Sequence, residues 1–395
     1  MLVLTALKVW HISGLDIKTA FSYGELGEEL YMEQPEGFKI PGQLHKVMCL
    51  KCAIYGLKQA ALAWCKALDK SMATLGCTCL LSDSGLFVNK ERNLIIIVYV
   101  DKVLFLGANK KEHFMKIWEC RDLGDANEFL HLCITWSKGH ILIDQKDYLQ
   151  KVLQHFNLIN AKSVPTPLPE GYQPQPNKGA SDPEICVSYQ QVIGPLLYIM
   201  IGTQPDIAYA LTKLSQFAVN LTQDHLNKAL YICCYLLGTS EYALVFDGKS
   251  NGSLIAYADS DWVSDSITRK STTGYLVKLA NGTFCWNSRV QKSIALSSTE
   301  AEYMLLSDTS KQVVWIHSLF KGIEIDLDSI PLCGDNQGSI FLASNPVQEK
   351  QIKHIDLRYH YIHEVICQKQ IELLFIEGAE TLQISSLKIL VTHKM

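Results

Sequence analysis

Acidic residues at the ends of several apolar runs are the best candidates for chemistry in this chain. Asp16 and Asp101 each follow an apolar run within the first hundred residues or so. Asp259 and Asp335 end two later apolar runs, and Glu302 lies early in a predicted helix. Hard divalent cations prefer carboxylate oxygens, and two such cations roughly 3.5–4 Å apart catalyse phosphoryl transfer. Both sets are therefore candidates for that reaction.

Each set also has a simpler interpretation. Spacing alone favours ordinary turn aspartates for Asp16 and Asp101. In the second set, Asp261 lies beside Asp259 and Glu300 beside Glu302, so the spacing leaves both open as alternative ligands. A helix cap of the S-x-x-E type explains Glu300 well but explains Glu302 poorly.

The elements around the first pair are predicted to be mixed helix and strand. Apolar spacing predicts a first helix that begins near residue 2 and ends near 11–14, and a second helix over 59–75. A strand pattern over 94–106 is interrupted at Asp101–Lys102. An apolar run, two charged residues and a second apolar run are typical of strand–turn–strand, which would lift Asp101 out of the sheet.

The middle of the chain is predicted to be a linker followed by helices. Residues 163–182 are rich in proline and glycine and predict the linker. Residues 189–237 are helical in pattern, with breaks predicted at Gly194–Pro195 and Gly202–Pro205.

From residue 253 onward the pattern predicts an α/β domain. Three strands are followed by a helix over 299–322, a strand, helices over 337–343 and 356–367, and a last strand. Strand ends in α/β sheets are the usual positions of functional sites, and Asp259 and Asp335 are predicted to lie there.

The composition indicates a globular chain. It has 395 residues, a net charge of −4, 48% hydrophobic and 19% charged residues, which excludes wholesale disorder and predicts two or three domains. The apolar run over 94–100 is far shorter than the roughly 20 residues of a membrane span, so we expect no membrane partner. The N-terminus shows no signal-peptide pattern. The 13 cysteines of the chain fit reduced intracellular thiols better than disulfides.

Three motifs in the first part resemble the reverse transcriptase of copia-type long-terminal-repeat retrotransposons. They are LDIKTAFSYGELGEELYMEQPEGF at 15–38, IYGLKQAALAW at 54–64 and YVDK at 99–102. The resemblance implies that Asp16 and Asp101 are catalytic metal ligands of a polymerase palm. It also implies nucleotide contacts by the segment after Asp16, with a sugar-selecting ring at its end: Ile17, Lys18, Thr19, Ala20 and Phe21.

This part departs from the family pattern at several positions. The family has a second aspartate where this chain has Lys102, and a lysine would place positive charge beside the cations. His131 replaces a glycine of the family's primer-side turn, which argues against that turn. Most of the family's basic fingers region is not in this sequence. We therefore expect a polymerase half that keeps its fold and has little or no activity.

Motifs in the last third resemble the copia-type ribonuclease H domain. These are YADSDW, TRKSTTGY, QKSIALSSTEAEY, CGDNQGSIFLASNP and KHIDLRYHYI. The resemblance implies that Asp259, Glu302 and Asp335 are catalytic and bind Mg²⁺ or Mn²⁺. The family's fourth carboxylate aligns with Ile384, so weakened cleavage is expected.

Basic residues of this domain are candidate contacts to nucleic acid through its phosphates. They are Arg269, Lys270, Lys292, His354 and Arg358, and a solvated charged face is the competing interpretation. The cysteine pairs Cys49/Cys52 and Cys77/Cys79, and a histidine cluster at 354–363, are weak metal candidates only.

The prediction is an α+β palm and thumb portion joined to an α/β ribonuclease H-like domain. The expected domains are a reverse transcriptase palm and thumb at 1–160, a linker with connecting helices at 161–250, and the ribonuclease H-like domain at 251–395. The expected partners are an RNA–DNA hybrid and template–primer, with a deoxynucleoside triphosphate if the polymerase is competent, in the cytoplasm or nucleus. A non-catalytic nucleic-acid-binding remnant and an unstable fossil translation are the alternatives.

Overall fold

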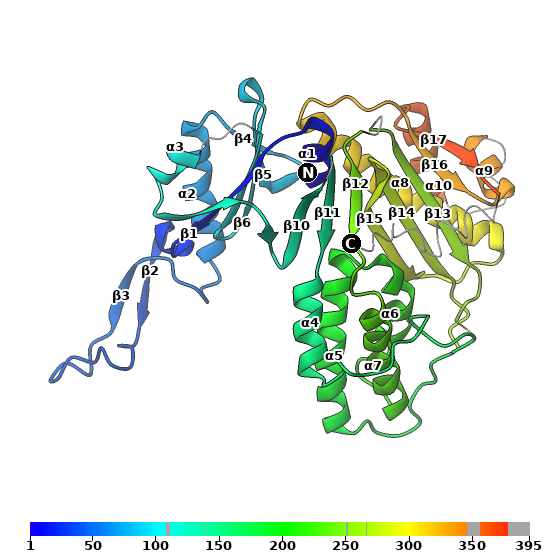
Figure 1. Ribbon diagram of the computed structural model, residues 1–395, viewed down its shortest axis with the longest axis horizontal. Helices are drawn as coiled ribbons and strands as arrows, with labels where there is room; N and C mark the ends of the chain where they lie inside the picture. The colour runs from blue at the N-terminus through cyan, green and yellow to red at the C-terminus, as the bar shows by residue number, and fades with distance from the viewer. Residues whose placement is uncertain (108–110, 138, 250–251, 266, 346–355, 378–395) are drawn as a thin grey trace. The chain divides into compact units, whose positions relative to one another are not determined.

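The structure, a computed structural model, describes residues 1–107, 111–137, 139–249, 252–265, 267–345 and 356–377 (Figure 1). Two compact units divide the chain. The smaller unit comprises Trp10–Ala126 and Leu319–Ile325, and the larger unit comprises Met1–Val9, Asn127–Ser318 and Asp326–Met395. The predicted domain boundaries at residues 160 and 250 stay predictions.

The smaller unit is built on a six-stranded antiparallel sheet with the strand order β4-β5-β6-β7-β1-β8. Its strands are β1 (Ile12–Ile17), β4 (Thr78–Leu80), β5 (Asp83–Asn89), β6 (Leu94–Tyr99), β7 (Lys102–Gly107) and β8 (Cys120–Asp125). A separate hairpin, β2 (Glu25–Met32) and β3 (Met48–Cys52), has mostly exposed residues. The predicted strand–turn–strand around Asp101 is confirmed as β6 and β7.

Helix α2 (Ala60–Thr74) packs the core of this unit, as predicted for 59–75. Its buried residues Trp64, Leu68 and Met72 lie at helical spacing and pack with Ile96 and Phe105 of the sheet. The packing of α2 therefore supports the strands that carry the β6–β7 turn. The remaining short elements are η1 (Ala20–Tyr23), η2 (Lys90–Arg92) and α3 (Lys111–Met115).

The larger unit begins with α1 (Leu2–Lys8) and an antiparallel sheet in the order β12-β11-β10-β9. Its strands are β9 (Glu128–Phe129), β10 (Leu132–Ser137), β11 (His140–Asp144) and β12 (Leu244–Asp247), and α4 (Lys146–His155) follows β11. The first helix was predicted to end near 11–14, which is wrong. Val9 takes a left-handed conformation that ends α1, and residues from Ile12 onward form β1 instead.

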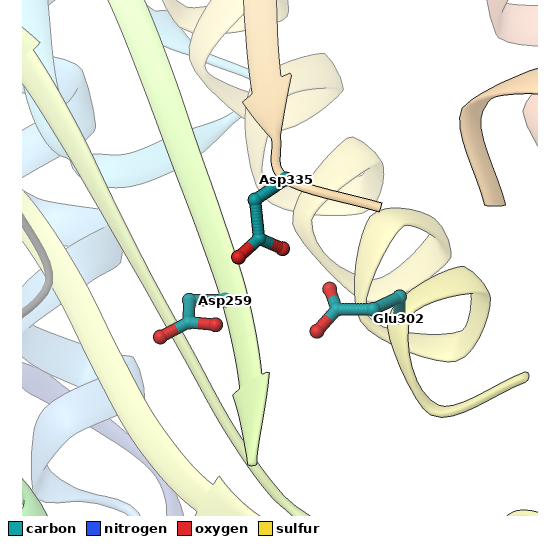
Figure 2. A group of neighbouring side chains, drawn as sticks. All are labelled: Asp259, Glu302 and Asp335. Atoms are coloured by element: carbon teal, nitrogen blue, oxygen red, sulfur yellow. The ribbon is translucent and has the colours of Figure 1, made fainter. Parts of the chain in front are cut away.

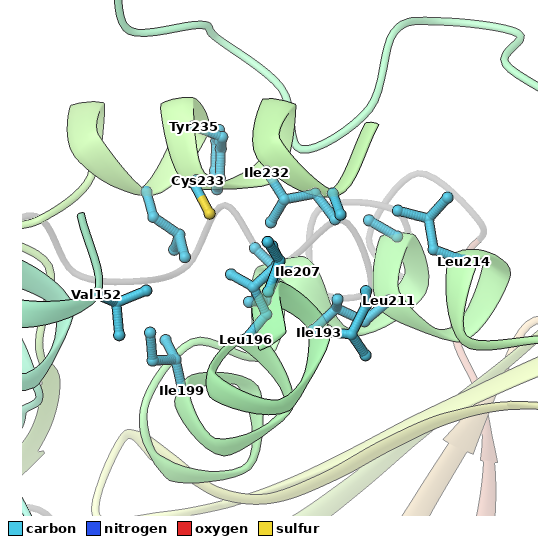
Figure 3. Close-up of a cluster of buried hydrophobic side chains, with 14 of the residues drawn as sticks. Val152, Ile193, Leu196, Ile199, Ile207, Leu211, Leu214, Ile232, Cys233 and Tyr235 are labelled. Atoms are coloured by element: carbon cyan, nitrogen blue, oxygen red, sulfur yellow. The ribbon is translucent and has the colours of Figure 1, made fainter. Parts of the chain in front are cut away.

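Helices α5 (Pro183–Gly202), α6 (Ala208–Ser215) and α7 (Gln223–Gly238) enclose a second core, and η3 (Pro205–Ile207) joins α5 to α6 (Figure 3). The break predicted at Gly194–Pro195 is wrong, because α5 continues through Pro195. An internal proline costs a helix about 3 kcal/mol. The buried residues Val192, Ile193 and Leu196 on either side offset that cost by packing into the core. The break predicted at Gly202–Pro205 is confirmed.

Helix α5 is also long and apolar enough, by composition, to cross a membrane. A single helix of this kind is weak evidence, because a core helix passes the same test. The absence of a membrane partner stays a prediction.

The predicted linker at 163–182 contains no helix or strand. It nevertheless packs against the helices. Val164 and Leu168 contact their core, and the Tyr172 hydroxyl donates to Asp224 Oδ2 at 2.7 Å. Asp182 then caps α5, since its Oδ1 accepts from the Glu184 amide at 2.9 Å.

A five-stranded mixed sheet in the order β15-β14-β13-β16-β17 completes the larger unit, and the predicted α/β pattern is confirmed. On one side of β13, β14 pairs antiparallel with β13 and β15 pairs antiparallel with β14. On the other side, β16 pairs parallel with β13 and β17 pairs parallel with β16. The elements are β13 (Leu254–Asp261), β14 (Thr272–Leu279), β15 (Gly282–Val290), α8 (Ser298–Gly322), β16 (Ile330–Gly334), α9 (Gln337–Ser344), α10 (Asp356–Cys367) and β17 (Ile371–Phe375).

Candidate active sites

Three carboxylates meet at one edge of the five-stranded sheet (Figure 2). Asp259 lies near the end of β13, and Asp335 directly follows β16. These strands are parallel neighbours, paired at Tyr257 and Cys333, so their carboxyl ends share one edge. Helix α8 brings Glu302 to the same place. One ligand oxygen from each side chain lies within 4.8 Å of the others, and this is the one such group of three or more acidic, His or Cys residues in the described ranges.

Glu302 is the buried member of this group, with 5% of its surface exposed. The Ser260 amide donates to Glu302 Oε1 at 2.9 Å and so fixes its orientation. Burial, followed by the negative charges of Asp259 and Asp335, raises the pKa of Glu302 to about 8. A divalent cation would offset both effects, because it attracts all three oxygens and stabilises the ionised form. The donor set therefore fits a hard divalent cation.

The two alternative ligands, Glu300 and Asp261, are not members of this carboxylate group. The Glu300 amide donates to Ser297 Oγ at 3.1 Å, while Glu300 Oε2 accepts from the Leu296 amide at 2.7 Å. These bonds are the cap that the sequence suggested for Glu300. Asp261 is the exposed last residue of β13.

A cavity of about 570 Å³ adjoins Asp259 within the larger unit. Its walls come from η3, α6 and the strands β13, β14 and β15, and include Tyr209, Tyr257 and Trp286. The surface next to the carboxylate group is thus hollowed on one side.

The carboxylates of the smaller unit are arranged differently. Asp16 pairs with Lys102 across β1 and β7, and the Lys102 ammonium contacts Asp16 Oδ2 at 2.7 Å. Asp101 lies in the β6–β7 turn, where its carbonyl accepts from the Ile17 amide at 2.7 Å. An ammonium already neutralises Asp16 at the position where cations would have to bind. This donor set does not fit a pair of divalent cations.

The segment after Asp16 is partly engaged within the protein. The Ile17 and Lys18 amides donate to the carbonyls of Asp101 and Glu119. Thr19, the next residue, has a left-handed φ of 49°. The nucleotide contacts predicted for residues 17–21 stay predictions.

Tyr55 is a neighbour of this site that the sequence did not single out. The rings of Phe21 and Tyr55 pack edge to face with centroids 4.6 Å apart. Burial raises the pKa of Tyr55, and the charges of Asp101 and Asp16 add to the rise. Tyr55 belongs to the IYGLKQAALAW motif at 54–64, and that motif was the sequence signal that could have identified it.

Comparisons with known proteins place this chain in a family. Residues 1–170 match the family model "Reverse transcriptase (RNA-dependent DNA polymerase)". The Pol polyprotein of transposon TNT 1-94 from Nicotiana tabacum is 35% identical over 385 residues, which is 93% of this chain and 29% of the relative. That of transposon RE2 from Arabidopsis thaliana is 34% identical over 367 residues, 90% of this chain and 25% of the relative. The chain belongs to the copia-type retrotransposon Pol family.

The chain corresponds to the reverse transcriptase and ribonuclease H region of these copia-type polyproteins, and spans between a quarter and a third of their length. The foamy viral protease–reverse transcriptase, solved in complex with dsDNA, resembles it with a TM-score of 0.45 and 13% identity. That alignment covers 95% of this chain and 70% of the viral one.

His131, at a glycine position of the copia-type pattern, was expected to disturb the turn between β9 and β10. The structure keeps that turn, with Leu130 and His131 both left-handed at φ 51° and 58°. Histidine adopts left-handed φ and ψ angles more often than most other non-glycine residues. The His131 ring also stacks on Tyr148 at 5.6 Å, and the Tyr198 hydroxyl donates to the Leu130 carbonyl at 2.5 Å.

The basic residues predicted to contact nucleic acid fall in different places. Arg269 and Lys292 are exposed, and Lys270 is partly exposed, in the segments that follow β13 and β15. His354 and Ile384 lie outside the described residues. Arg358 lies in α10, but its side chain is outside the described part of the chain.

Proposed function

We propose that the larger unit cleaves the RNA strand of an RNA–DNA hybrid, as a ribonuclease H. The observation that carries this proposal is the convergence of Asp259, Glu302 and Asp335 within 4.8 Å. Their positions on two parallel strand ends and a helix suit a phosphodiester that approaches the sheet edge. The copia-type family supports the same assignment.

Asp259, Glu302 and Asp335 would hold Mg²⁺ or Mn²⁺. When bound, such cations activate water and stabilise the leaving oxygen of phosphoryl transfer. The protein's own contribution is orientation. Two strand ends fix the aspartates, and the Ser260 amide holds Glu302. Glu302 must lose its proton to act as an anionic ligand, and its pKa of about 8 makes that loss pH-dependent.

We propose that cleavage is weaker than in an intact copia-type enzyme. The basis is the alignment of Ile384 with the family's fourth carboxylate, at a position outside the described residues. Loss of one ligand weakens cation binding and leaves the other three in place.

We further propose that the smaller unit does not polymerise DNA. The Lys102–Asp16 ion pair supports this, because it neutralises a carboxylate that the polymerase reaction needs. Template–primer binding and deoxynucleoside triphosphate binding are separate questions, and both stay predictions, as does a cytoplasmic or nuclear location.

The experiment is cleavage of an end-labelled RNA–DNA hybrid by the full chain. We expect Mg²⁺- or Mn²⁺-dependent cleavage that chelation stops and Asp335→Asn abolishes. Asp16→Asn is the matched control, since it removes a carboxylate from the other site and should leave cleavage unchanged. Cleavage that survives Asp335→Asn would refute the assignment.

A non-catalytic nucleic-acid-binding remnant is the second candidate, and the neutralised Asp16 favours it. It predicts salt-sensitive binding of the hybrid without cleavage in either metal. A molten chain, with secondary structure but no fixed tertiary packing, would instead indicate an unstable fossil translation.

A further inference from the structure

The hairpin of β2 and β3 in the smaller unit has two outer edges, and the described strands include none that pairs with either edge. Figure 1 shows the hairpin, in blue, extending away from the six-stranded sheet of its own unit. An unpaired strand edge presents backbone N–H and C=O groups that can pair with another strand. A two-stranded hairpin alone is marginally stable in water, and further strands stabilise it. The hairpin can therefore accept another strand and is expected to gain stability from it.

The two outer edges differ in charge. Strand β2 contains three glutamates, Glu25, Glu28 and Glu29, whereas the charged residue of β3 is Lys51. Charged side chains on an edge strand oppose pairing, and like charges opposite each other destabilise it. Two β2 strands would bring their glutamates together. The edge of β3 is therefore the one available for pairing.

The sequence of β3 suits antiparallel pairing with β3 of a second copy. A two-fold axis at Leu50 sets this residue opposite its counterpart and pairs all five residues of the strand. An axis at Cys49 pairs residues 48–50 alone. An axis at Lys51 pairs residues 50–52 alone and sets two ammonium groups opposite each other. The axis at Leu50 thus gives the longest pairing and keeps the lysines apart.

This pairing joins apolar side chains into one surface. Side chains alternate between the faces of a strand, so Met48 and Leu50 share a face. Their partners in β2, Met32 and Leu30, lie on the same face. Met48 is exposed and the other three are half-buried. In the four-stranded sheet of two hairpins, the same residues of the second copy continue this apolar face across the axis.

The other face of the hairpin brings opposite charges together. Tyr31 pairs with Cys49, and the Tyr31 hydroxyl donates to Glu29 Oε2 at 2.8 Å, so Glu29 lies on this face as well. Lys51 shares the face of Cys49, because the two residues are two positions apart in one strand. Across the axis, Lys51 of each copy lies opposite Cys49 of the other, next to the Tyr31–Glu29 pair of that copy. The charges of the two edges are therefore complementary.

The loop between β2 and β3 supplies a second contact. Gln34 orders this loop through three side-chain hydrogen bonds of 2.7–2.8 Å to loop backbone groups. The ordered loop nevertheless exposes 78% of Phe38, 69% of Leu44 and 55% of Val47. Apolar side chains that an ordered loop holds in water often mark an interaction surface.

The same register places the loop against the second copy. Val47 directly precedes β3 and Ala53 directly follows it, so the axis at Leu50 sets Val47 opposite Ala53 of the other copy. Ala53 leads into Ile54 and Tyr55, which are exposed. The exposed loop of each copy thus meets exposed apolar residues of the other. A standard interface buries roughly 800 Å² per partner, and this contact adds to the area that the paired strands supply.

We propose that the chain forms a two-fold symmetric dimer through antiparallel pairing of its β3 strands, centred on Leu50. The partner is a second copy of this chain, because the β3 edge is complementary to itself in register, apolar face and charge. A closed two-fold interface also limits the assembly to two copies. The dimer concerns the smaller unit and does not depend on the proposed nuclease function.

The first test is sedimentation velocity of the full chain over a range of concentrations. We expect a monomer–dimer equilibrium that Leu50→Lys shifts toward the monomer. The dimer Kd should rise about tenfold or more, because two ammonium groups would face each other at the axis. Leu81→Lys is the matched control, since Leu81 is fully exposed in the turn between β4 and β5, and it should leave the Kd unchanged. A monomer at every concentration, or a dimer unaffected by Leu50→Lys, would overturn the proposal.

Cross-linking tests the register without adding charge. In a chain carrying Cys49→Ser and Cys52→Ser, Leu50→Cys sets two thiols opposite each other. Their expected Cα separation of about 4.5–5.5 Å is one that a disulfide spans. Copper-catalysed air oxidation should then give a covalent dimer on a non-reducing gel, above the baseline of the same chain without Leu50→Cys.

Leu30→Cys in the same background is the matched control for cross-linking. Leu30 pairs with Leu50 within one copy, so in the dimer it lies on an outer strand and cannot meet its counterpart. This variant should stay at the baseline. Equal cross-linking of Leu30→Cys and Leu50→Cys would show that the thiols meet by random collision, and the proposal would fail.

The same assays recognise other occupants of the β3 edge. Loss of the dimer in both Leu81→Lys and Leu50→Lys would indicate nonspecific association and would overturn the proposal. A monomeric chain in which Leu50→Lys weakens binding of a fluorescent RNA–DNA template–primer would assign the edge to nucleic acid, and would overturn it as well.

Discussion

The two carboxylate sites differ in what lies next to their acids. In the smaller unit the Lys102 ammonium contacts Asp16 at 2.7 Å. In the larger unit Glu302 is buried beside Asp259 and Asp335, and its pKa rises to about 8. An acid that is already neutralised gains little from a cation, whereas crowded carboxylates gain much. The comparison teaches that two sets of acids on intact sheets can differ in their need for a cation, because a lysine beside one acid already balances its charge.

The largest expected effect separates the two sites by activity. Asp335→Asn should abolish detectable cleavage of an RNA–DNA hybrid, a loss of at least about 100-fold, since loss of a catalytic electrostatic contact commonly costs that much. Asp16→Asn should reduce it less than twofold. Initial rates from gel-resolved products measure both. Equal losses in the two variants would break the comparison.

The next effect is the pH dependence of stability in the larger unit. The folded-state pKa of Glu302 is above its ordinary value of 4.5, so the folded chain holds a proton that the unfolded chain releases. Without metal, stability should fall as the pH rises between about 5 and 8, by at most about 1.4 kcal/mol per pH unit. Urea unfolding in a chelator at several pH values measures this.

Glu302→Gln provides the control for that pH series. It should flatten the slope, because glutamine does not titrate. Added Mg²⁺ should also reverse the fall near pH 8 in the unsubstituted chain, since the cation favours the ionised carboxylate. A slope that persists in Glu302→Gln would assign the effect to another group.

A smaller effect is expected from Lys102→Asp, which makes the first site resemble the second. The change removes the ion pair and adds a carboxylate. The stability without metal should drop by about 1 kcal/mol and recover in Mn²⁺. Paramagnetic titration of Mn²⁺ should show additional bound metal relative to the unsubstituted chain. Identical Mn²⁺ binding would mean that this site is limited by something other than Lys102.

The smallest effect is expected from Lys102→Ala. The ion pair is partly exposed, and such pairs contribute about 0–1 kcal/mol. Urea unfolding should show a loss within that range, which shrinks further at high salt. A loss of several kcal/mol would mean that the pair supports the β1–β7 register itself.

Much of the candidate carboxylate site was predictable because it depends on local pattern. Asp259 and Asp335 end apolar strands, and the S-x-x-E pattern favoured a cap for Glu300, whose cap bonds the structure contains. The pairing of Lys102 with Asp16 follows from the strand–turn–strand pattern only once β1 is known to lie beside β7. Such long-range registers are not encoded in the local sequence.

Other features could not be predicted from the sequence, because contacts between residues distant in the chain determine them. Pro195 was predicted to break a helix that its buried neighbours sustain. The Lys18 amide is engaged by Glu119, which is far from it in sequence. The His131 turn survives because a tyrosine stacks on a ring that glycine would lack. In each case a contact distant in the chain outweighed a sound local preference.

The parallel pairing of β13 with β16 has a consequence for how the chain matures. Between these strands lie two antiparallel strands and the longest helix, so the crossover must be complete before Asp335 reaches Asp259. A nascent chain that has not yet added β16 can bring together only two of the three acids. Tight cation binding by the larger unit would therefore indicate that β16 has been synthesised and has paired with β13.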